Sequence, residues 1–174
     1  MLKELTTLRL FFKDPSQVYS ARELAKSAKM SHITVAKLLK QYNFITRAKN
    51  GPYVGFKAEP TAEFIRLRFL YNYQNIFESG LIDYLNTHFN HPTMVLFGSY
   101  AKAENIQTSD VDICVISQIS DLPDLQKFET KLELPVQLFI KSKKELLAMK
   151  KDNSYLLNSI CNGIILQGEL EVFE

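Results

Sequence analysis

The sequence predicts an α+β protein in two parts, a small helical module with a β-hairpin followed by a mixed sheet flanked by helices. Three short amphipathic helix patterns precede an Asn-Gly hairpin signal within the first 60 residues. A long helix pattern follows, and beyond residue 90 apolar runs of strand length alternate with helix patterns. We therefore expect a first domain over residues 1–60, linker helices over 61–90 and a second domain over 91–174.

Charge is distributed unevenly along the chain. The 174 residues carry a net charge of only +2. Residues 1–60 hold eleven Lys and Arg against four Asp and Glu, a net charge of +7, which leaves −5 for residues 61–174. This asymmetry favours a polyanion-binding module joined to a metal-binding one, and uneven surface charge without a function is the alternative.

Neither a membrane span nor a signal peptide is predicted. No apolar stretch approaches the roughly 20 residues that a membrane span requires. Lys3, Glu4 and Arg9 interrupt the N-terminus, where a signal peptide would be apolar. Cys114 and Cys161 both lie in apolar runs, which predicts buried thiols and fits a reducing compartment. We expect a soluble, cytoplasmic protein with no membrane partner.

Three helices are predicted in the first domain, over residues 3–13, 21–28 and 32–42. Ser20 and Glu23 form a capping-box pattern at the start of the second helix. The third helix follows a capping serine, and its buried stripe is expected to include the aromatic residue at its end, Tyr42. The spacing of that stripe leaves four residues on the outer face of the third helix: His32, Thr34, Lys37 and Lys40.

A basic hairpin is predicted over residues 44–57. Asn50-Gly51 is a strong turn signal because both residues tolerate positive φ, although the following Pro52 allows a longer turn. Three helices followed by such a hairpin resemble a winged helix-turn-helix domain. The resemblance implies binding to double-stranded DNA, with the outer face of the third helix in the major groove and Arg47 and Lys49 on the phosphates. A protein-docking module with the same fold is the alternative.

Residues 61–78 are predicted to form a long helix whose apolar residues surround most of its axis. More than one face must then be buried. Packing between two domains, a homodimer interface through this linker helix and an ordinary core helix all remain open. His88 and His91 follow a second helix over residues 81–89 and are expected at the surface, without a carboxylate partner and not as metal ligands.

Residues 94–116 carry the pattern on which the functional prediction depends. An apolar strand ends at Gly98-Ser99, a helical turn and a polar loop follow, and a second strand begins at Asp110. Asp110 and Asp112 should project from one face of that strand, roughly 7 Å apart. Two such carboxylates suit a Mg²⁺ ion that also holds substrate phosphates. Gly98 permits close approach of a ligand to the backbone, and Ser99 offers a hydroxyl and an N–H to an anion.

This ordered set resembles the DNA polymerase β-like nucleotidyltransferase superfamily, and its minimal nucleotidyltransferase branch most closely. The pattern Gly-Ser-x-Ala-(Arg/Lys)-Gly is matched at residues 98–102, and Ala103 stands where the final glycine is usual. The resemblance implies transfer of a nucleoside monophosphate from a nucleoside triphosphate to an acceptor. It assigns the catalytic and Mg²⁺-binding roles to Asp110 and Asp112, and nucleotide binding to three further residues: Gly98, Ser99 and Lys102.

The third strand of the predicted sheet, over residues 134–141, departs from the superfamily pattern. Helices are expected over 121–132, 142–151 and 153–162, with a short final strand over 163–168. Active members of the superfamily usually carry a third carboxylate in the third strand, where this chain has Gln137; Glu133 could replace it only in another register. This neutral residue favours the alternative hypothesis of a catalytically weak or inactive DNA-binding regulator, or of an antitoxin-like protein with a helical protein partner.

Overall fold

The computed structural model describes residues 3–171, without the side chains of Lys3, Glu4 and Asn50. The chain divides into two compact units, Met1–Tyr71 and Asn72–Glu174. The long helix α4 (Ala62–Ser79) contributes its first half to one unit and its second half to the other. No helix in the described part of the chain is both long enough and apolar enough to cross a membrane.

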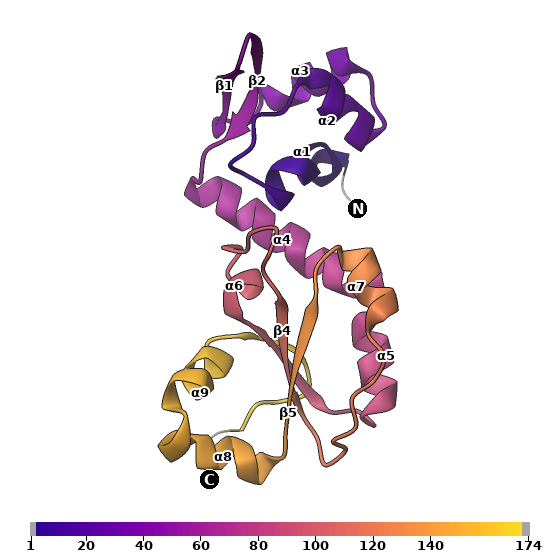
Figure 1. Ribbon diagram of the computed structural model, residues 1–174, viewed down its shortest axis with the longest axis vertical. Helices are drawn as coiled ribbons and strands as arrows, with labels where there is room; N and C mark the ends of the chain where they lie inside the picture. Colours follow the sequence, from indigo (N-terminus) through magenta and orange to yellow (C-terminus); the bar gives the residue numbers. More distant parts are fainter. Residues whose placement is uncertain (1–2, 172–174) are drawn as a thin grey trace. The chain divides into compact units, whose positions relative to one another are not determined.

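Three helices and a hairpin precede α4 in the N-terminal unit (Figure 1). They are α1 (Lys3–Lys13), α2 (Ala21–Ala28), α3 (His32–Leu39), β1 (Ile45–Asn50) and β2 (Tyr53–Ala58). The antiparallel register pairs Asn50 with Tyr53, so the turn consists of Gly51 and Pro52. It lies one residue later than predicted, and the φ of +60° at Gly51 suits glycine. Tyr19 extends the hairpin through main-chain hydrogen bonds to Phe56 of 2.9 and 2.8 Å.

The predicted capping box at α2 is confirmed. The main-chain N–H of Glu23 donates to Ser20 Oγ at 3.2 Å, and the N–H of Ser20 donates to Glu23 Oε2 at 2.7 Å. Helix α3 ends at Leu39 instead of Tyr42, because the chain tightens there into i→i−3 hydrogen bonds, from the N–H of Gln41 to Leu38 and from that of Tyr42 to Leu39.

The core of the N-terminal unit includes the first half of α4. Phe12 packs against Phe64 and Tyr71 of that helix, with ring centroids 5.5 and 5.0 Å apart. Arg68 is almost fully buried, and its Nε donates to the main-chain oxygen of Phe12 at 2.8 Å. These contacts tie α1 to α4, so the compact unit extends beyond the hairpin to Tyr71.

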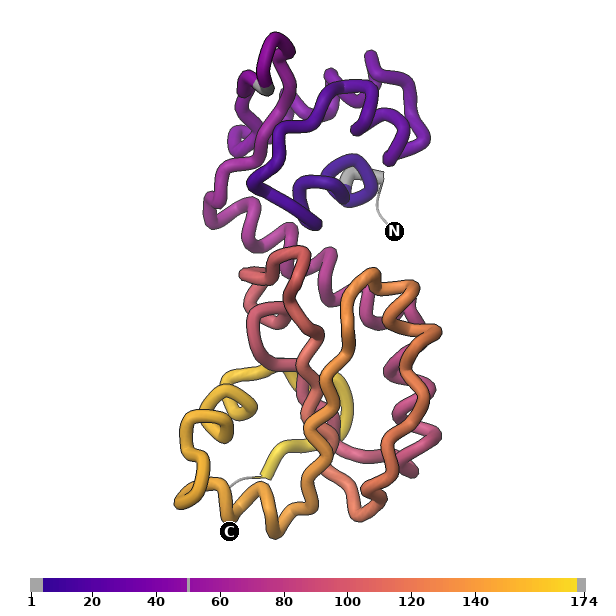
Figure 2. The backbone as a smooth tube through the Cα atoms, viewed as in Figure 1, coloured from indigo at the N-terminus to yellow at the C-terminus, as the bar shows by residue number. Residues whose placement is uncertain are grey.

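The C-terminal unit is a four-stranded mixed sheet between two layers of helices (Figures 1 and 2). The strand order is β5–β4–β3–β6, with β3 antiparallel to β4 and β6, and with β4 parallel to β5. The elements are α5 (Leu81–His88), β3 (Thr93–Phe97), α6 (Gly98–Ala101), β4 (Val111–Ile116), α7 (Gln126–Leu132), β5 (Val136–Lys141), α8 (Lys143–Asp152), α9 (Ser154–Cys161) and β6 (Ile164–Gln167).

Alternation along β4 divides the core between the two faces of the sheet. Ile113 and Val115 belong to the cluster that also contains Leu85 of α5 and Phe128 of α7. Cys114 belongs to the opposite cluster, with residues of α8 and α9. Burial raises the pKa of Cys114 to about 12, so its thiol is unreactive. Cys161, in contrast, is exposed, and the prediction that it is buried is wrong.

Two prolines shorten elements that the sequence patterns overextend. Helix α7 begins at Gln126 instead of residue 121, and Leu122 is 74% exposed instead of facing the core. The residue before a proline is disfavoured in the helical conformation, and Pro123 follows Leu122. Strand β5 begins at Val136, directly after Pro135, because proline has no N–H to donate to the ladder. Proline therefore overrides the hydrophobic pattern at both positions, through the backbone of the preceding residue in one and through its missing N–H in the other.

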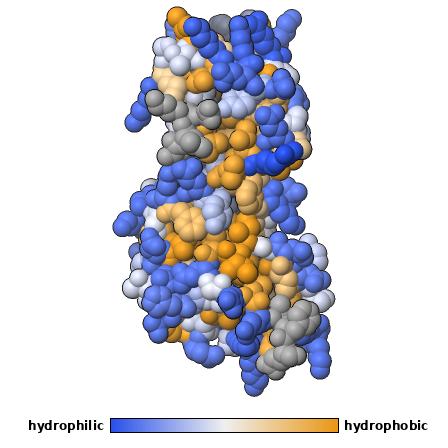
Figure 3. Space-filling view, turned by 180° about the vertical axis from the view of Figure 1, so that it is seen from behind, coloured by the Kyte–Doolittle hydropathy of each residue, from blue (hydrophilic) through white to orange (hydrophobic). Residues whose placement is uncertain are grey.

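Helix α4 keeps large apolar side chains at the surface. Ile65, Leu70 and Phe77 are 41%, 52% and 42% exposed, respectively. Figure 3 shows hydrophobic residues reaching the surface among hydrophilic ones on the side of the molecule that it views. The expectation that more than one face of α4 is buried is therefore met only in part within a single chain.

Candidate functional site

The two aspartates of the predicted metal site lie at the start of β4. Asp112 is the second residue of the strand and is partly buried, whereas Asp110 is exposed and lies just before the strand, not within it as predicted. The pKa of Asp112 is raised above its ordinary value of 3.8, first by burial and second by the negative charge of Asp110. A bound cation would relieve both effects, because it favours the ionised carboxylates.

Gly98 lies directly against Asp112. The register of β3 on β4 pairs Phe97 with Asp112, and the chain turns at Gly98 with a φ of +75°. A Cβ atom on Gly98 would overlap Asp112 Oδ2, so a side chain at this position would displace the carboxylate. Glycine therefore allows the Gly98-Ser99 turn and the carboxylate to approach the same ligand.

The turn after Gly98 is a single helical turn, α6, with a partly exposed Ser99. The main-chain oxygen of Ser99 accepts a hydrogen bond of 2.9 Å from the N–H of Glu104. Lys102 ends the turn and is exposed, so its ammonium group is free to move towards an anion. The structure thus places Gly98, Ser99 and Lys102 on one short segment whose start lies against Asp112.

Gln137 is the direct neighbour of Asp112 on β5. The parallel register pairs Asp112 with Gln137, and Cys114 with Phe139 two residues further along. Phe139 packs edge-to-face on Phe97 at 5.1 Å, within the cluster on the same face of the sheet as Cys114. Gln137 therefore shares the face of Asp112 and is exposed there.

Within the described residues, no third carboxylate, histidine or cysteine joins the pair of aspartates. Glu133 caps the C-terminus of α7 in a left-handed conformation, with a φ of +59°, and lies outside β5. Nowhere between residues 3 and 171, leaving aside the side chains not described, do three or more His, Cys, Asp or Glu residues gather to hold a metal. Two hard carboxylates remain, and they suit one Mg²⁺ that receives its other ligands from phosphates and water.

Comparison with protein-family models matches residues 79–170 to the nucleotidyltransferase family of polymerase beta. The chain belongs to this nucleotidyltransferase family. The superfamily predicted from the Gly-Ser and Asp-x-Asp pattern is thereby confirmed, and family membership implies a nucleoside triphosphate substrate. No significant match was found among curated proteins or among solved structures.

Ala103 departs from the nucleotidyltransferase pattern at a position where the backbone favours glycine. Its φ is +57° and its side chain is buried. A left-handed conformation costs an alanine about 1–2 kcal/mol relative to glycine. The usual glycine of the pattern therefore has a conformational reason, and this chain adopts a left-handed turn at Ala103 at some cost in stability.

Sequence patterns did not reveal a group of buried polar residues next to the nucleotidyltransferase turn. Asn72 of α4, Tyr100 of α6 and Asn105 of the following loop are all at most 5% exposed and are hydrogen-bonded to one another. A polar residue within an apolar stretch of α4 was the signal that could have identified Asn72, because buried amides usually have specific partners.

The six residues predicted to contact DNA are all exposed in the N-terminal unit: His32, Thr34, Lys37, Lys40, Arg47 and Lys49. Thr34 is nevertheless engaged in the N-cap of α3. Its hydroxyl oxygen lies 2.8 Å from Ser31 Oγ, and its N–H donates to the same atom at 3.1 Å. Ile33 is 58% exposed beside it, and the hairpin exposes Tyr53 and Val54 by 76% and 62%. Sequence patterns missed these three apolar residues.

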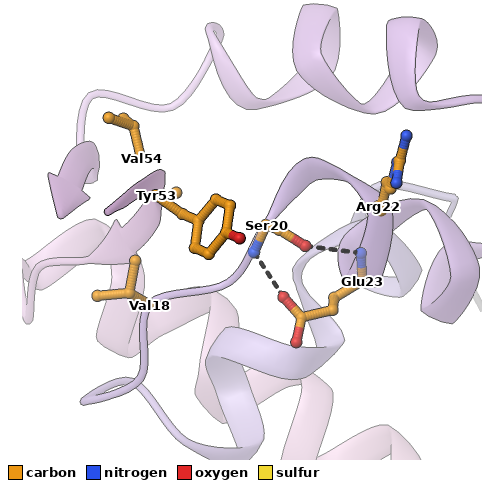
Figure 4. Close-up of a pocket in the computed structure, with 7 residues that line it drawn as sticks. Val18, Ser20, Arg22, Glu23, Tyr53 and Val54 are labelled. Carbon is orange, nitrogen blue, oxygen red and sulfur yellow. Dashed lines mark hydrogen bonds between the residues drawn. The ribbon is translucent and has the colours of Figure 1, made fainter. Parts of the chain in front are cut away.

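A cavity of about 500 Å³ lies between the hairpin and the start of α2 (Figure 4). The ring of Tyr53 points towards Ser20 across it, whereas Arg22 points away. The cavity contains none of the predicted nucleotide-binding residues. A second cavity of about 410 Å³ includes Thr93 and Ile116, which pair at the end of the sheet opposite Gly98 and Asp112.

The histidines of the nucleotidyltransferase unit are not part of the aspartate site. His88 is partly buried, and its Nε2 lies 3.1 Å from Asp121 Oδ2. The expectation that His88 has no carboxylate partner is therefore wrong. His91 is exposed, with a φ of +59°, as expected of a residue in a surface turn.

Proposed function

We propose that the C-terminal unit binds a nucleoside triphosphate together with Mg²⁺. Asp110 and Asp112 would hold the metal, and the segment from Gly98 to Lys102 would hold the triphosphate. The observation that supports this proposal is the contact of Gly98 with the Asp112 carboxylate, because the segment proposed to bind phosphate and the residue proposed to bind the metal meet there. The chemistry of two adjacent carboxylates fits a hard cation with oxygen ligands.

We further propose that transfer of the nucleoside monophosphate is slow or absent. When bound, the metal would neutralise phosphate charge and polarise the α-phosphate. Gln137 lies where a third carboxylate would hold a second metal and take a proton from the acceptor. A neutral amide does neither, because it is a poor Mg²⁺ ligand and has no basic lone pair at neutral pH. Binding is therefore expected without efficient catalysis.

Calorimetry of Mg²⁺ and nucleoside triphosphates with the whole chain tests the binding proposal. Replacing both aspartates by Asn preserves their size and removes their charge, so the Mg²⁺-dependent affinity should disappear. Exchange of two exposed carboxylates elsewhere in the same unit, Asp152→Asn with Glu169→Gln, is the matched control. Equal affinity in the aspartate double variant and in the wild type would refute the proposal.

A second proposal assigns duplex DNA binding to the N-terminal unit as a winged helix-turn-helix. The order of α1, the Tyr19 bridge, α2, α3 and the β1–β2 hairpin supports it, as does the charge of +7 over residues 1–60. Helix α3 would enter the major groove with His32, Lys37 and Lys40, and the hairpin would place Arg47 and Lys49 on phosphates. Thr34 would act chiefly through its cap, and Ile33 offers an apolar contact for thymine methyl groups.

These two activities together describe a DNA-binding regulator that responds to a nucleotide. The neutral Gln137 favours this regulatory function over a transferase function. An antitoxin-like role with a helical protein partner belongs to the same proposal, as does a homodimer through α4, where Ile65, Leu70 and Phe77 are exposed. Sedimentation of the whole chain with and without Leu70→Glu tests the dimer.

A further inference from the structure

Asn72 holds two segments of the aspartate site with one side chain. Its Nδ2 donates to the main-chain oxygen of Tyr100 at 3.0 Å and to Asn105 Oδ1 at 2.8 Å. Tyr100 Oη donates in return to the main-chain oxygen of Asn72 at 3.2 Å. All three residues are buried and belong to the C-terminal unit. Both hydrogens of the Asn72 amide are therefore used to join segments that are separate in sequence.

The two segments carry different parts of the site. Tyr100 lies in α6, two residues after Gly98, so the first hydrogen bond fixes the turn that would hold phosphates. Asn105 begins the loop that ends at Asp110, so the second bond fixes the start of the metal-binding segment. The same amide therefore connects the phosphate turn to the segment that delivers Asp110.

Hydrogen bonds within the rest of the loop link the position of Asn105 to that of Asp110. The N–H of Ile106 donates to Ser109 Oγ at 2.9 Å, and the N–H of Ser109 donates to the main-chain oxygen of Ile106 at 3.0 Å. This closed turn leaves few conformations between Asn105 and Asp110. The position of Asp112 does not depend on this loop, because the hydrogen-bond ladders to β3 and β5 hold it. Asp110 precedes β4, so its position depends on the loop.

We propose that Asn72 is a positioning residue that sets the spacing between the Gly98-Ser99 turn and Asp110 for binding of Mg²⁺ with a nucleoside triphosphate. This inference rests on the proposed nucleotide-binding function. A purely structural role could be met by hydrogen bonds within the helix itself, as at Ser79, whose Oγ donates to the main-chain oxygen of Ile76. All three hydrogen bonds instead converge on the two segments that must meet the same ligand.

The test compares Asn72→Ala with Ser79→Ala in the whole chain. Ser79 is a matched control because it is a buried polar residue on the same helix with two local bonds, from its Oγ to the oxygen of Ile76 at 2.6 Å and from the N–H of Leu81 at 3.1 Å. Calorimetry with the four ribonucleoside triphosphates, in Mg²⁺ and in EDTA, gives the Mg²⁺-dependent gain in affinity. Melting curves give the stability of each variant, so that binding is measured well below unfolding.

Asn72→Ala should reduce the Mg²⁺-dependent gain about tenfold, the lower end of the loss for a direct partner of a metal ligand, because Asn72 acts on Asp110 through the loop that begins at Asn105. Ser79→Ala should change the Mg²⁺-dependent gain less than twofold, even if its melting temperature falls as much as that of Asn72→Ala. Asn105→Ala should reproduce the loss, because it breaks the loop side of the same link, and it replaces Asn72→Ala if that variant does not fold.

Two outcomes would overturn the inference without affecting the proposed function. In the first, the Mg²⁺-dependent gain in affinity of Asn72→Ala and Asn105→Ala stays within twofold of that of the wild type. In the second, Ser79→Ala loses as much of this gain as Asn72→Ala does. A wild-type chain that shows no Mg²⁺-dependent affinity for any of the four triphosphates would overturn the proposed nucleotide function and the positioning role together. Because the first two results require a wild-type chain that binds, the failure of each proposal is distinguishable from that of the other.

Discussion

Replacing Gln137 by Asp should restore the missing carboxylate of the site. Adjacent strands lie about 4.8 Å apart, so the new carboxylate would come close to that of Asp112, its partner in the parallel register. Gln137 is exposed, so solvent screens the repulsion, and a pair of charges about 5 Å apart in nearly aqueous surroundings costs about 1 kcal/mol. Without metal, Gln137→Asp should therefore lower the free energy of unfolding by about 1 kcal/mol at pH 7, and Mg²⁺ should offset this loss.

The catalytic consequence of Gln137→Asp is larger than its effect on stability. A positioned general base or metal ligand contributes about 10²–10⁴ in rate, so the variant should accelerate transfer by a factor in that range with nearly unchanged nucleotide affinity. Single-turnover transfer from α-labelled triphosphates to glycerol, a generic hydroxyl acceptor, measures the effect, and Gln137→Asn controls for the shorter side chain. Fast transfer by the wild type, or slower transfer by Gln137→Asp, would show that a carboxylate elsewhere, such as Glu133, acts in catalysis.

Three further predictions concern stability, DNA binding and assembly. Asp112→Asn should raise the free energy of unfolding of the metal-free protein at pH 7, because the raised pKa means that ionisation destabilises the folded state; urea titrations should show the gain vanishing as the pH falls below 3.8, the ordinary carboxyl value. Lys37→Ala with Lys40→Ala should weaken duplex DNA binding and reduce the slope of log affinity against log salt by about 2, whereas Lys144→Ala with Lys151→Ala should leave both unchanged. Leu70→Glu should abolish any concentration-dependent dimer in sedimentation, and the same change at the still more exposed Leu122 should not.

The functional segment of the C-terminal unit was largely predictable from sequence because its elements depend on local patterns. The apolar run before Gly98 and the Val- and Ile-rich run after Asp110 became β3 and β4, and the predicted place of Gln137 on the third strand agrees with the register of β5. Strand and turn patterns span a few residues, so they survive without knowledge of the tertiary contacts.

Other features depend on contacts between distant segments and could not be predicted. The hydrogen bonds of Asn72 to Tyr100 and Asn105 join residues that are 28 and 33 positions apart. The contact of His88 Nε2 with Asp121 Oδ2 joins another distant pair, so the sequence around His88 gave no indication of it. The starts of α7 and β5 were missed for a different reason, since the effects of Pro123 and Pro135 were given less weight than the hydrophobic pattern.

The costs that the aspartate site imposes on the unliganded fold favour ligand binding as its function. Burial and the negative charge of Asp110 raise the pKa of Asp112, so the ionised form of Asp112 is destabilised in the unliganded fold. Ala103 keeps a left-handed backbone that alanine adopts only at a cost. A bound cation would offset the first cost directly, and binding energy from phosphates at the turn would offset the second. A bound ligand can offset both costs without a catalytic base. The neutral Gln137 beside Asp112 is therefore compatible with ligand binding. The arrangement therefore supports nucleotide binding even where transfer is slow. In the proposed regulator, a bound nucleotide would change the affinity for DNA, and this function needs no catalysis.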